Sequence, residues 1–219
     1  VNMPVKVGLQ IIEKWKESLE EQVLAYEHET VEQGKIVFYG PSYFTRWSQK
    51  FGMMPLKEVL VGESGQPCCV NRGFGSSCAE HHLYYYPRMV RALAPKVLVY
   101  ASHGNGGSFG YSNEETWELA QRVIQYALTD FPDIHIYLTS AHPTKNMSDE
   151  EIEGKRTYNK WVKEFAENTP RCSYVDVFEY EPLRAKDNFI DDGVHFNAKG
   201  YQIYGEFFKE ILKDELIKY

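Results

Sequence analysis

Apolar residues recur at intervals of three and four near the start of the chain and then gather in short continuous runs. The first pattern predicts an amphipathic helix over residues 8–28, formed around Leu9, Ile12, Trp15, Leu19 and Val23. Five apolar runs follow, each bounded by polar or glycine-containing segments, and they predict buried strands. The runs cover residues 35–39, 67–70, 96–101, 134–139 and 173–178.

Helical periodicity fills most of the segments between these runs. It predicts helices over residues 79–93, 112–131 and 148–166, and a last helix that begins near Asn197. Ser112 and Glu115 have the spacing of a capping box, and Ser148 and Glu151 repeat it. Strands that alternate with helices and are almost wholly apolar predict an α/β fold, in which helices cover both faces of a five-stranded parallel sheet.

Length and charge narrow the class of protein. The 219 residues, 43% of them hydrophobic, suit one domain over residues 1–219, with residues 1–33 as a helical extension packed on it. The formal net charge is -7 and no basic cluster stands out, so we expect no nucleic-acid partner. No apolar run reaches the roughly 20 residues of a membrane helix, so we expect no membrane partner. Oligomeric state is not predicted.

The cysteines lack the spacing of a metal site. Four are present, at Cys68, Cys69, Cys78 and Cys172, and none forms a CxxC pair. Reduced thiols favour a reducing, cytoplasmic compartment, although a signal peptide removed earlier would leave no trace in this sequence. We predict neither a metal nor another cofactor.

Candidate chemistry collects after the carboxyl ends of the predicted strands, where open α/β sheets bind ligands. Ser42 follows the first strand, and Asp192-Gly193-Val194-His195 lies after the fifth. A serine hydroxyl becomes a good nucleophile only when a base takes its proton, and His195 is the candidate base. Asp192, three residues earlier, is placed to orient the imidazole. The three residues predict nucleophilic catalysis.

Hydrolysis of an ester also needs donors for the negative charge on the carbonyl oxygen. The backbone N–H groups of Ser42, Gly75 and Ser76 are candidates. The side-chain amide of Asn105, after the third strand, is another. These residues predict an oxyanion hole built from three loops.

Four sequence blocks, in this order, resemble the SGNH (GDSL-like) hydrolase family over about residues 34–212. They are FYGPS around Ser42, NRGFGSS from Asn71, YASHGNG from Tyr100 and DDGVHFNAKGY from Asp191. The resemblance implies a flavodoxin-like three-layer α/β/α fold and metal-free ester hydrolysis through an acyl-serine. It also implies Ser42 as nucleophile, His195 as base, Asp192 as its partner and Asn105 as an oxyanion donor.

The sequence departs from the family pattern in three of the blocks. Pro41 precedes the serine where the family often has aspartate, and Ser76 stands where the family has its oxyanion glycine. In the third block the usual flanks are replaced, with His103 and Gly106 beside Asn105. We therefore expect His103 to be a substrate contact.

Two further residues are candidates for substrate binding. Trp47 follows the nucleophile by five residues, and packing is its alternative role. His142 follows the fourth strand and so lies on the same rim. The remaining histidines are interpreted as structural; His81 and His82, adjacent on a helix, cannot both face one ligand.

The predicted function is hydrolysis of a short-chain oxygen ester, with acetyl favoured and a carbohydrate as a candidate alcohol; the partner is then a small-molecule or carbohydrate ester. A lipase or thioesterase of the same family is the alternative. From another class, Gly104, Gly106 and Gly110 loosely fit the phosphate-binding loop of a nucleotide-binding module, and a silent carbohydrate-binding member is a third possibility. Both of these leave the serine, aspartate and histidine without a role.

Overall fold

The sheet has five parallel strands in the order β2-β1-β3-β4-β5. The structure, a computed structural model, describes residues 12–219. The strands are β1 (Ile36–Gly40), β2 (Cys69–Gly73), β3 (Val97–Tyr100), β4 (His135–Thr139) and β5 (Cys172–Val175). The register pairs Ile36 of β1 with Cys69 on one side and with Val97 on the other. All of the strands therefore end at the same edge of the sheet.

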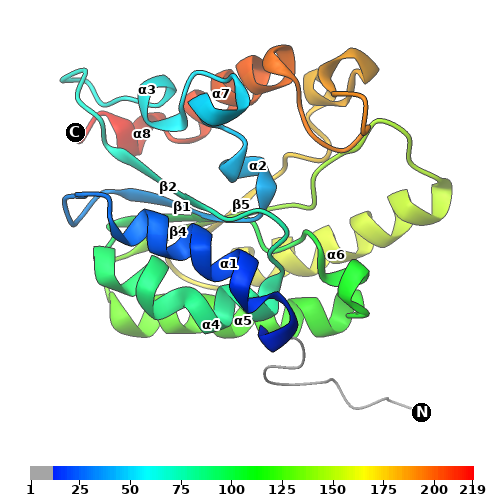
Figure 1. Ribbon diagram of the computed structural model, residues 1–219, viewed down its shortest axis with the longest axis horizontal. Coiled ribbons are helices and arrows are strands. Elements are labelled where there is room, and N and C mark those ends of the chain that lie inside the picture. Colours follow the sequence, from blue (N-terminus) through cyan, green and yellow to red (C-terminus); the bar gives the residue numbers. More distant parts are fainter. Residues whose placement is uncertain (1–11) are drawn as a thin grey trace.

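Helices cover both faces of this sheet, as Figure 1 shows. One layer holds α1 (Ile12–Glu27), α4 (Ala79–Met89), α5 (Asn113–Asp130) and α6 (Asp149–Glu167). The other holds α2 (Ser42–Thr45), α3 (Leu56–Val59), α7 (Ala198–Ile211) and α8 (Lys213–Leu216). Short 3-10 helices occupy Gln49–Phe51, Arg91–Leu93, Gly106–Phe109, Glu181–Arg184 and Lys186–Asn188. The predicted three-layer α/β/α fold is confirmed.

Each face of the sheet carries its own hydrophobic core, because side chains alternate along a strand. On β1, Val37 and Tyr39 pack with α4 and α5, whereas Ile36 and Phe38 pack with α7. All five residues of β1 are buried, which explains why its sequence is a continuous apolar run. Of the described helices, none is long and apolar enough to cross a membrane.

Several predicted boundaries differ from the structure for identifiable reasons. The strand expected at 67–70 is β2, which begins at Cys69 and stays paired with β1 as far as Gly73. The polar Arg72 fits there because its buried guanidinium pairs with Glu29, 3.2 Å away. The helix expected over 79–93 ends at Met89, with Pro87 inside its last turns. Proline cannot donate the backbone hydrogen bond that continues an α-helix. Residues 8–11 of the first predicted helix lie outside the described part.

Residues 41–45, called the nucleophile segment after the predicted role of Ser42, are held by a close approach of α2 to the end of β2. A Cβ atom on Gly73 would lie 2.4 Å from the backbone nitrogen of Thr45. Asn71 donates its side-chain amide to the Phe44 carbonyl oxygen at 2.6 Å, and Tyr201 donates its hydroxyl to the Tyr43 carbonyl oxygen at 2.8 Å. The one-turn helix that begins at Ser42 is thus fixed from both sides.

We expect Gly73→Ala to lower the free energy of unfolding by about 1–3 kcal/mol, since the added methyl group overpacks this contact. Urea unfolding followed by circular dichroism measures the change. Gly107→Ala is the matched control, because a Cβ atom there meets nothing within 4 Å. Equal stability of the two variants would contradict the proposed constraint.

Candidate active site

The structure brings Ser42, His195 and Asp192 into one line. Ser42 Oγ lies 2.9 Å from His195 Nε2, and His195 Nδ1 lies 2.5 Å from Asp192 Oδ2. Ser42 begins α2 directly after β1, while the other two residues precede α7. These contacts let the imidazole accept the serine proton at one nitrogen while the carboxylate holds the other.

A tight turn positions the aspartate and the histidine. Gly193 has φ +70°, a left-handed conformation that favours glycine. Asp192 Oδ1 accepts hydrogen bonds from the backbone N–H groups of Val194 and His195. Partial burial raises the pKa of the Asp192 carboxyl, but the hydrogen bonds from the His195 ring and these N–H groups outweigh it and lower the pKa to about 2. The carboxylate is therefore ionised at neutral pH.

The replacement of aspartate by proline before the nucleophile fits the local structure. Pro41 is the N-cap residue directly before α2, with φ -81°, and its carbonyl oxygen accepts from the Phe44 N–H at 3.2 Å. The first N–H groups of a helix have no acceptor inside the helix, so a proline at this position loses no helical hydrogen bond.

Not all of the predicted oxyanion donors have an N–H group that is available to a ligand. The prediction that Gly75 is an oxyanion donor is wrong, because its N–H already donates to Gln22 Oε1 at 2.7 Å. The N–H groups of Ser42 and Ser76 have no acceptor among the described residues. Ser76 has φ +65°, a left-handed conformation that is uncommon for a residue other than glycine. One N–H of the Asn105 amide donates to the Ser77 carbonyl oxygen, which leaves its second N–H available.

Buried contacts hold the second and third loops against the nucleophile. A Cβ atom on Gly104 would lie 2.9 Å from Pro41, so the Asn105 loop touches the residue before the nucleophile. On the other side, Ser77 Oγ is 2.9 Å from Nε2 of the buried His82. His82 Nδ1 is in turn 3.0 Å from the Tyr100 hydroxyl. These hydrogen bonds connect Tyr100 at the end of β3 to Ser77, whose carbonyl oxygen accepts from the Asn105 amide.

The three candidate substrate contacts fall in different places. The prediction that Trp47 contacts substrate is wrong. Its side chain is 1% exposed and stacks on Tyr204 with ring centroids 5.1 Å apart, so it belongs to the core. His142 is also 1% exposed, and its ring stacks on Tyr43 at 3.8 Å. His142 therefore packs against the nucleophile segment from the interior of the protein. His103 is half-buried beside Asn105 and remains a predicted contact.

Sequence reasoning gave no role to three residues that fix the loops. Gln22 holds Gly75, Asn71 holds α2, and Tyr201 holds Tyr43. Asn71 opens the NRGFGSS block, so its place in that block was the available signal. Tyr201 closes the DDGVHFNAKGY block and had the same signal. Nothing local indicates Gln22, because its partner is 53 residues away.

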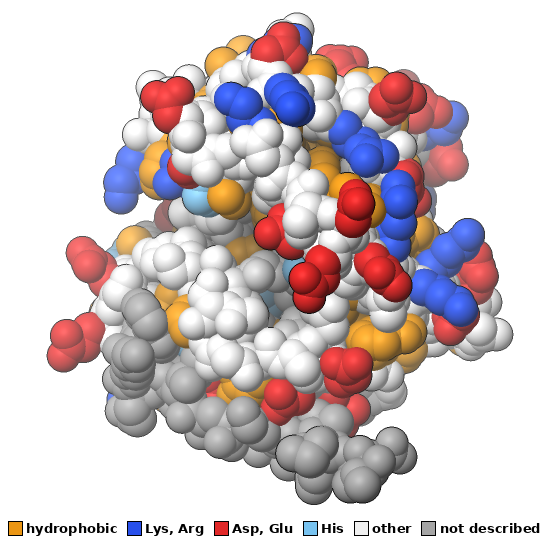
Figure 2. Space-filling model, turned by 90° about the vertical axis from the view of Figure 1, so that its right-hand side faces the viewer, with side chains coloured by type: hydrophobic (Ala, Val, Ile, Leu, Met, Phe, Trp, Pro, Cys, Tyr) orange, Lys and Arg blue, Asp and Glu red, His pale blue; other side chains and the backbone are white. Residues whose placement is uncertain are grey.

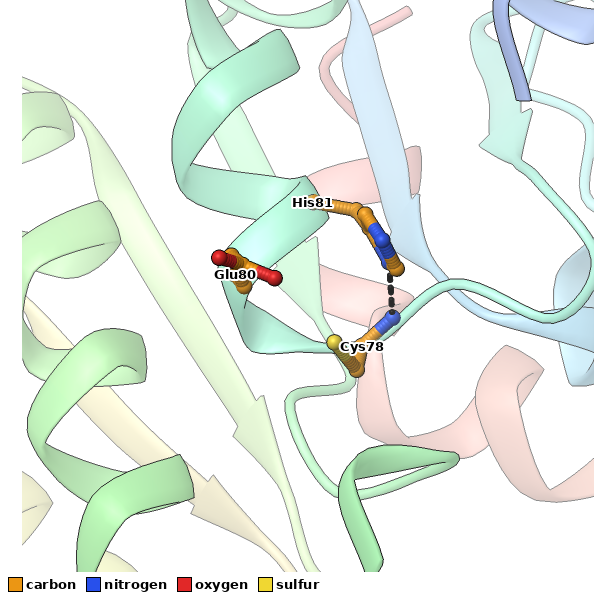
Figure 3. Close-up of side chains that lie close together, drawn as sticks. All are labelled: Cys78, Glu80 and His81. Atoms are coloured by element: carbon orange, nitrogen blue, oxygen red, sulfur yellow. Dashed lines mark hydrogen bonds between the residues drawn. The ribbon is translucent and has the colours of Figure 1, made fainter. Parts of the chain in front are cut away.

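Cys78, Glu80 and His81 form a buried group whose possible metal-binding atoms lie within 4.8 Å of one another (Figure 3). Cys78 caps α4, and its N–H donates to His81 Nδ1 at 3.0 Å. Burial lowers the pKa of His81 to about 4 and raises that of Cys78 to about 11, so imidazole and thiol are both neutral. The lone pair of Nδ1 is already engaged, and a helix cap accounts for the arrangement.

The face at the carboxyl ends of the strands is hollowed, and histidine side chains are visible there (Figure 2). Aspartate and glutamate side chains gather along one edge of the hollow. A cavity of about 980 Å³ lies elsewhere, along the outer strand β2, lined among others by Tyr26, Lys35 and Cys69. Neither Ser42 nor His195 lines it.

Comparison with known proteins bears on this arrangement. The model of the GDSL-like Lipase/Acylhydrolase family matches residues 39–203. No curated protein sequence matches the chain. A Streptococcus pneumonia protein provisionally described as a platelet activating factor is similar in structure, with 22% identity, a TM-score of 0.71, and coverage of 94% of this chain and 97% of that chain.

Two other solved structures share the fold. A GDSL-like lipase from Bacteroides thetaiotaomicron has 17% identity and a TM-score of 0.69, with coverage of 92% of this chain and 98% of that chain. A catalytic mutant of an acetylxylan esterase from Geobacillus stearothermophilus has 16% identity and a TM-score of 0.63, with coverage of 83% and 95%. At these identities the likeness extends to the fold alone.

The lowered pKa of Asp192 predicts a pH-dependent contribution to stability. Because the folded pKa of about 2 lies below the ordinary 3.8, the contribution is complete above the ordinary value and is lost as the pH falls toward 2. We therefore expect the difference in unfolding free energy between wild type and Asp192→Asn to shrink between pH 5 and pH 2. Urea titrations across this range measure it, and a constant difference would contradict the prediction.

Proposed function

Because the chain belongs to the GDSL-like lipase/acylhydrolase family, we propose that it is a serine esterase with Ser42 as its nucleophile. The observation that carries this proposal is the hydrogen-bonded line from Ser42 through His195 to Asp192. A line of this kind supplies a nucleophile, a base within reach of its proton and a group that orients the base.

In the proposed reaction, His195 Nε2 takes the Ser42 proton as Oγ bonds to the ester carbonyl carbon. The imidazolium then gives this proton to the leaving alcohol, and an acyl-serine remains. Water attacks the acyl-serine with His195 again as base, which releases the acid and restores the serine. Asp192, ionised at neutral pH, stabilises the imidazolium in both steps.

The tetrahedral intermediates need donors aimed at their oxyanion. We propose the N–H groups of Ser42 and Ser76 and the free N–H of the Asn105 amide for this role. Their preorganisation supports the proposal, since the Ser77 carbonyl oxygen already orients the Asn105 amide. Prepositioned donors act without a reorganisation cost during the reaction, and a single one is typically worth about 10²–10³ in kcat.

A short acyl group fits the surroundings of the nucleophile. Tyr43 is 8% exposed and stacked on His142, and Phe44 is fully buried in the core. A long acyl chain could enter the protein beside these two residues only by displacing their rings. We therefore propose acetyl as the preferred acyl group, and the similarity to an acetylxylan esterase supports a carbohydrate as the alcohol.

We expect Ser42→Ala to lower kcat/KM for 4-nitrophenyl acetate by about 10⁴-fold or more, because the nucleophile is lost. His195→Ala should lose nearly as much, since the two residues act as a unit, and Asp192→Asn should lose less. A fluorophosphonate probe should label wild type but not Ser42→Ala. Ser18→Ala, an exposed serine on α1, is the control. Wild-type rates in Ser42→Ala would refute the assignment.

Acyl preference is tested with a series of 4-nitrophenyl esters from acetyl to octanoyl. We expect kcat/KM to fall as the chain lengthens, since the packed rings of Tyr43 and Phe44 leave little room beside Ser42. Rates are compared after subtraction of the Ser42→Ala background. A clear preference for octanoyl would favour the lipase alternative over a short-chain esterase.

A further inference from the structure

Lys155 on α6 is a basic residue with an unusual environment. Its Nζ donates to the backbone carbonyl oxygen of His142 at 2.8 Å, and its side chain is half-buried. Burial lowers its pKa to about 8, although nearby Glu151 opposes this effect. Among the described residues, no carboxylate lies within ion-pairing distance of this ammonium group. Three other basic residues of the same helix do have such partners, namely Arg156 with Glu179, Lys160 with Glu164, and Lys163 with Glu167.

The Lys155 ammonium group is linked to the nucleophile segment through His142. The ring of His142, whose carbonyl oxygen it contacts, stacks on Tyr43, the residue after Ser42. Gly104, from the loop of His103 and Asn105, touches Pro41, the residue before Ser42. The two loops next to Lys155 therefore contact the nucleophile segment on both sides.

His103 adds a second polar group at the same place. Its ring packs edge-on against Tyr158, one turn along α6 from Lys155, with centroids 4.7 Å apart. Burial, with a contribution from the Lys155 charge, lowers the pKa of His103 to about 4. A hydrogen bond with the Asn113 side chain opposes this shift, and the imidazole is neutral at pH 7, so it lines the site without adding charge. Asn113 contributes to the same cluster, donating to the carbonyl oxygen of Gly154 at 3.1 Å.

We propose that Lys155 and His103 form a subsite for an anionic group, a carboxylate, carried by the ester that Ser42 attacks. This inference rests on the proposed esterase function and deepens it. The half-buried ammonium group of Lys155 has lost part of its hydration. Among the described residues, the His142 carbonyl oxygen is the one hydrogen-bond acceptor that replaces it. A substrate carboxylate would give the ammonium group a charge-assisted hydrogen bond, which is about twice as strong as a neutral one.

The acidic side chains at the edge of the hollow do not oppose this subsite strongly. At physiological ionic strength, charges in water are screened over about 8 Å, whereas contacts with a partly buried charge are screened much less. A carboxylate that reaches Lys155 therefore interacts mainly with the ammonium group. A neutral ester at the same place gains only ordinary hydrogen bonds.

The test compares esters that differ only in a carboxylate and its neutral amide. One arm places the charge on the alcohol side, with 4-acetoxybenzoate against 4-acetoxybenzamide. The other places it on the acyl side, with the 4-nitrophenyl monoesters of succinic acid and of succinamic acid. The readout is the ratio of kcat/KM for the anionic ester to that for the neutral one, in which any general loss of activity cancels.

We expect Lys155→Met to lower this ratio by about tenfold or more in at least one arm, as the loss of a hydrogen bond to a charged group predicts. Lys155→Gln, which can still donate to the His142 carbonyl oxygen, should lower it similarly if Lys155→Met folds poorly. Lys155→Arg should retain most of the ratio. Lys160→Met, an exposed lysine on the same helix, should leave both rates unchanged.

The outcomes separate this inference from the proposed function. A ratio that stays at the wild-type value in both arms for Lys155→Met and Lys155→Gln would overturn the subsite, provided that Ser42→Ala is inactive on all four esters. Full hydrolysis of these esters by Ser42→Ala would instead overturn the esterase proposal itself.

Discussion

The close packing of α2 on the end of β2 is the constraint on which the rest of the site depends. A nucleophile at the first residue of a one-turn helix has little structure of its own to hold it, since so short a helix is unstable alone. Gly73 lets the helix backbone approach, and hydrogen bonds from Asn71 and Tyr201 fix two of its carbonyl oxygens. Ser42 can then face His195, a residue 153 positions later in the chain.

The fold was largely predictable because its determinants are local. Continuous apolar runs mark strands that are buried on both faces, and the capping box at Ser112 and Glu115 is present with both of its hydrogen bonds. Ser42, Asp192 and His195 were also found from sequence, because each follows a strand and the rim of a parallel sheet gathers such residues. Their catalytic roles remain proposals.

The predictions that failed concern tertiary contacts that spacing does not encode. Trp47 lies close to the nucleophile in sequence, but its ring turns into the core against Tyr204. The N–H of Gly75 looked available until α1 placed Gln22 beside it. Lys155 drew no attention among the many charges of α6, and only the fold shows that it has no carboxylate partner among the described residues. In each case a distant segment decides what a residue can do.

The docking of α1 has a consequence for dynamics. Gln22 contacts the N–H and the carbonyl oxygen of Gly75, at 2.7 and 3.3 Å, and the Tyr26 hydroxyl donates to the Gly73 carbonyl oxygen at 2.6 Å. Proteins open locally in cooperative units, and helices packed on the outside of a sheet open at lower free energy than its central strands. When α1 detaches, the loop of Ser76 loses its outer support while the Ser42–His195–Asp192 line stays intact. Release of the first helix would thus leave the proposed nucleophile in place while the loop that carries a proposed oxyanion donor, Ser76, is no longer held.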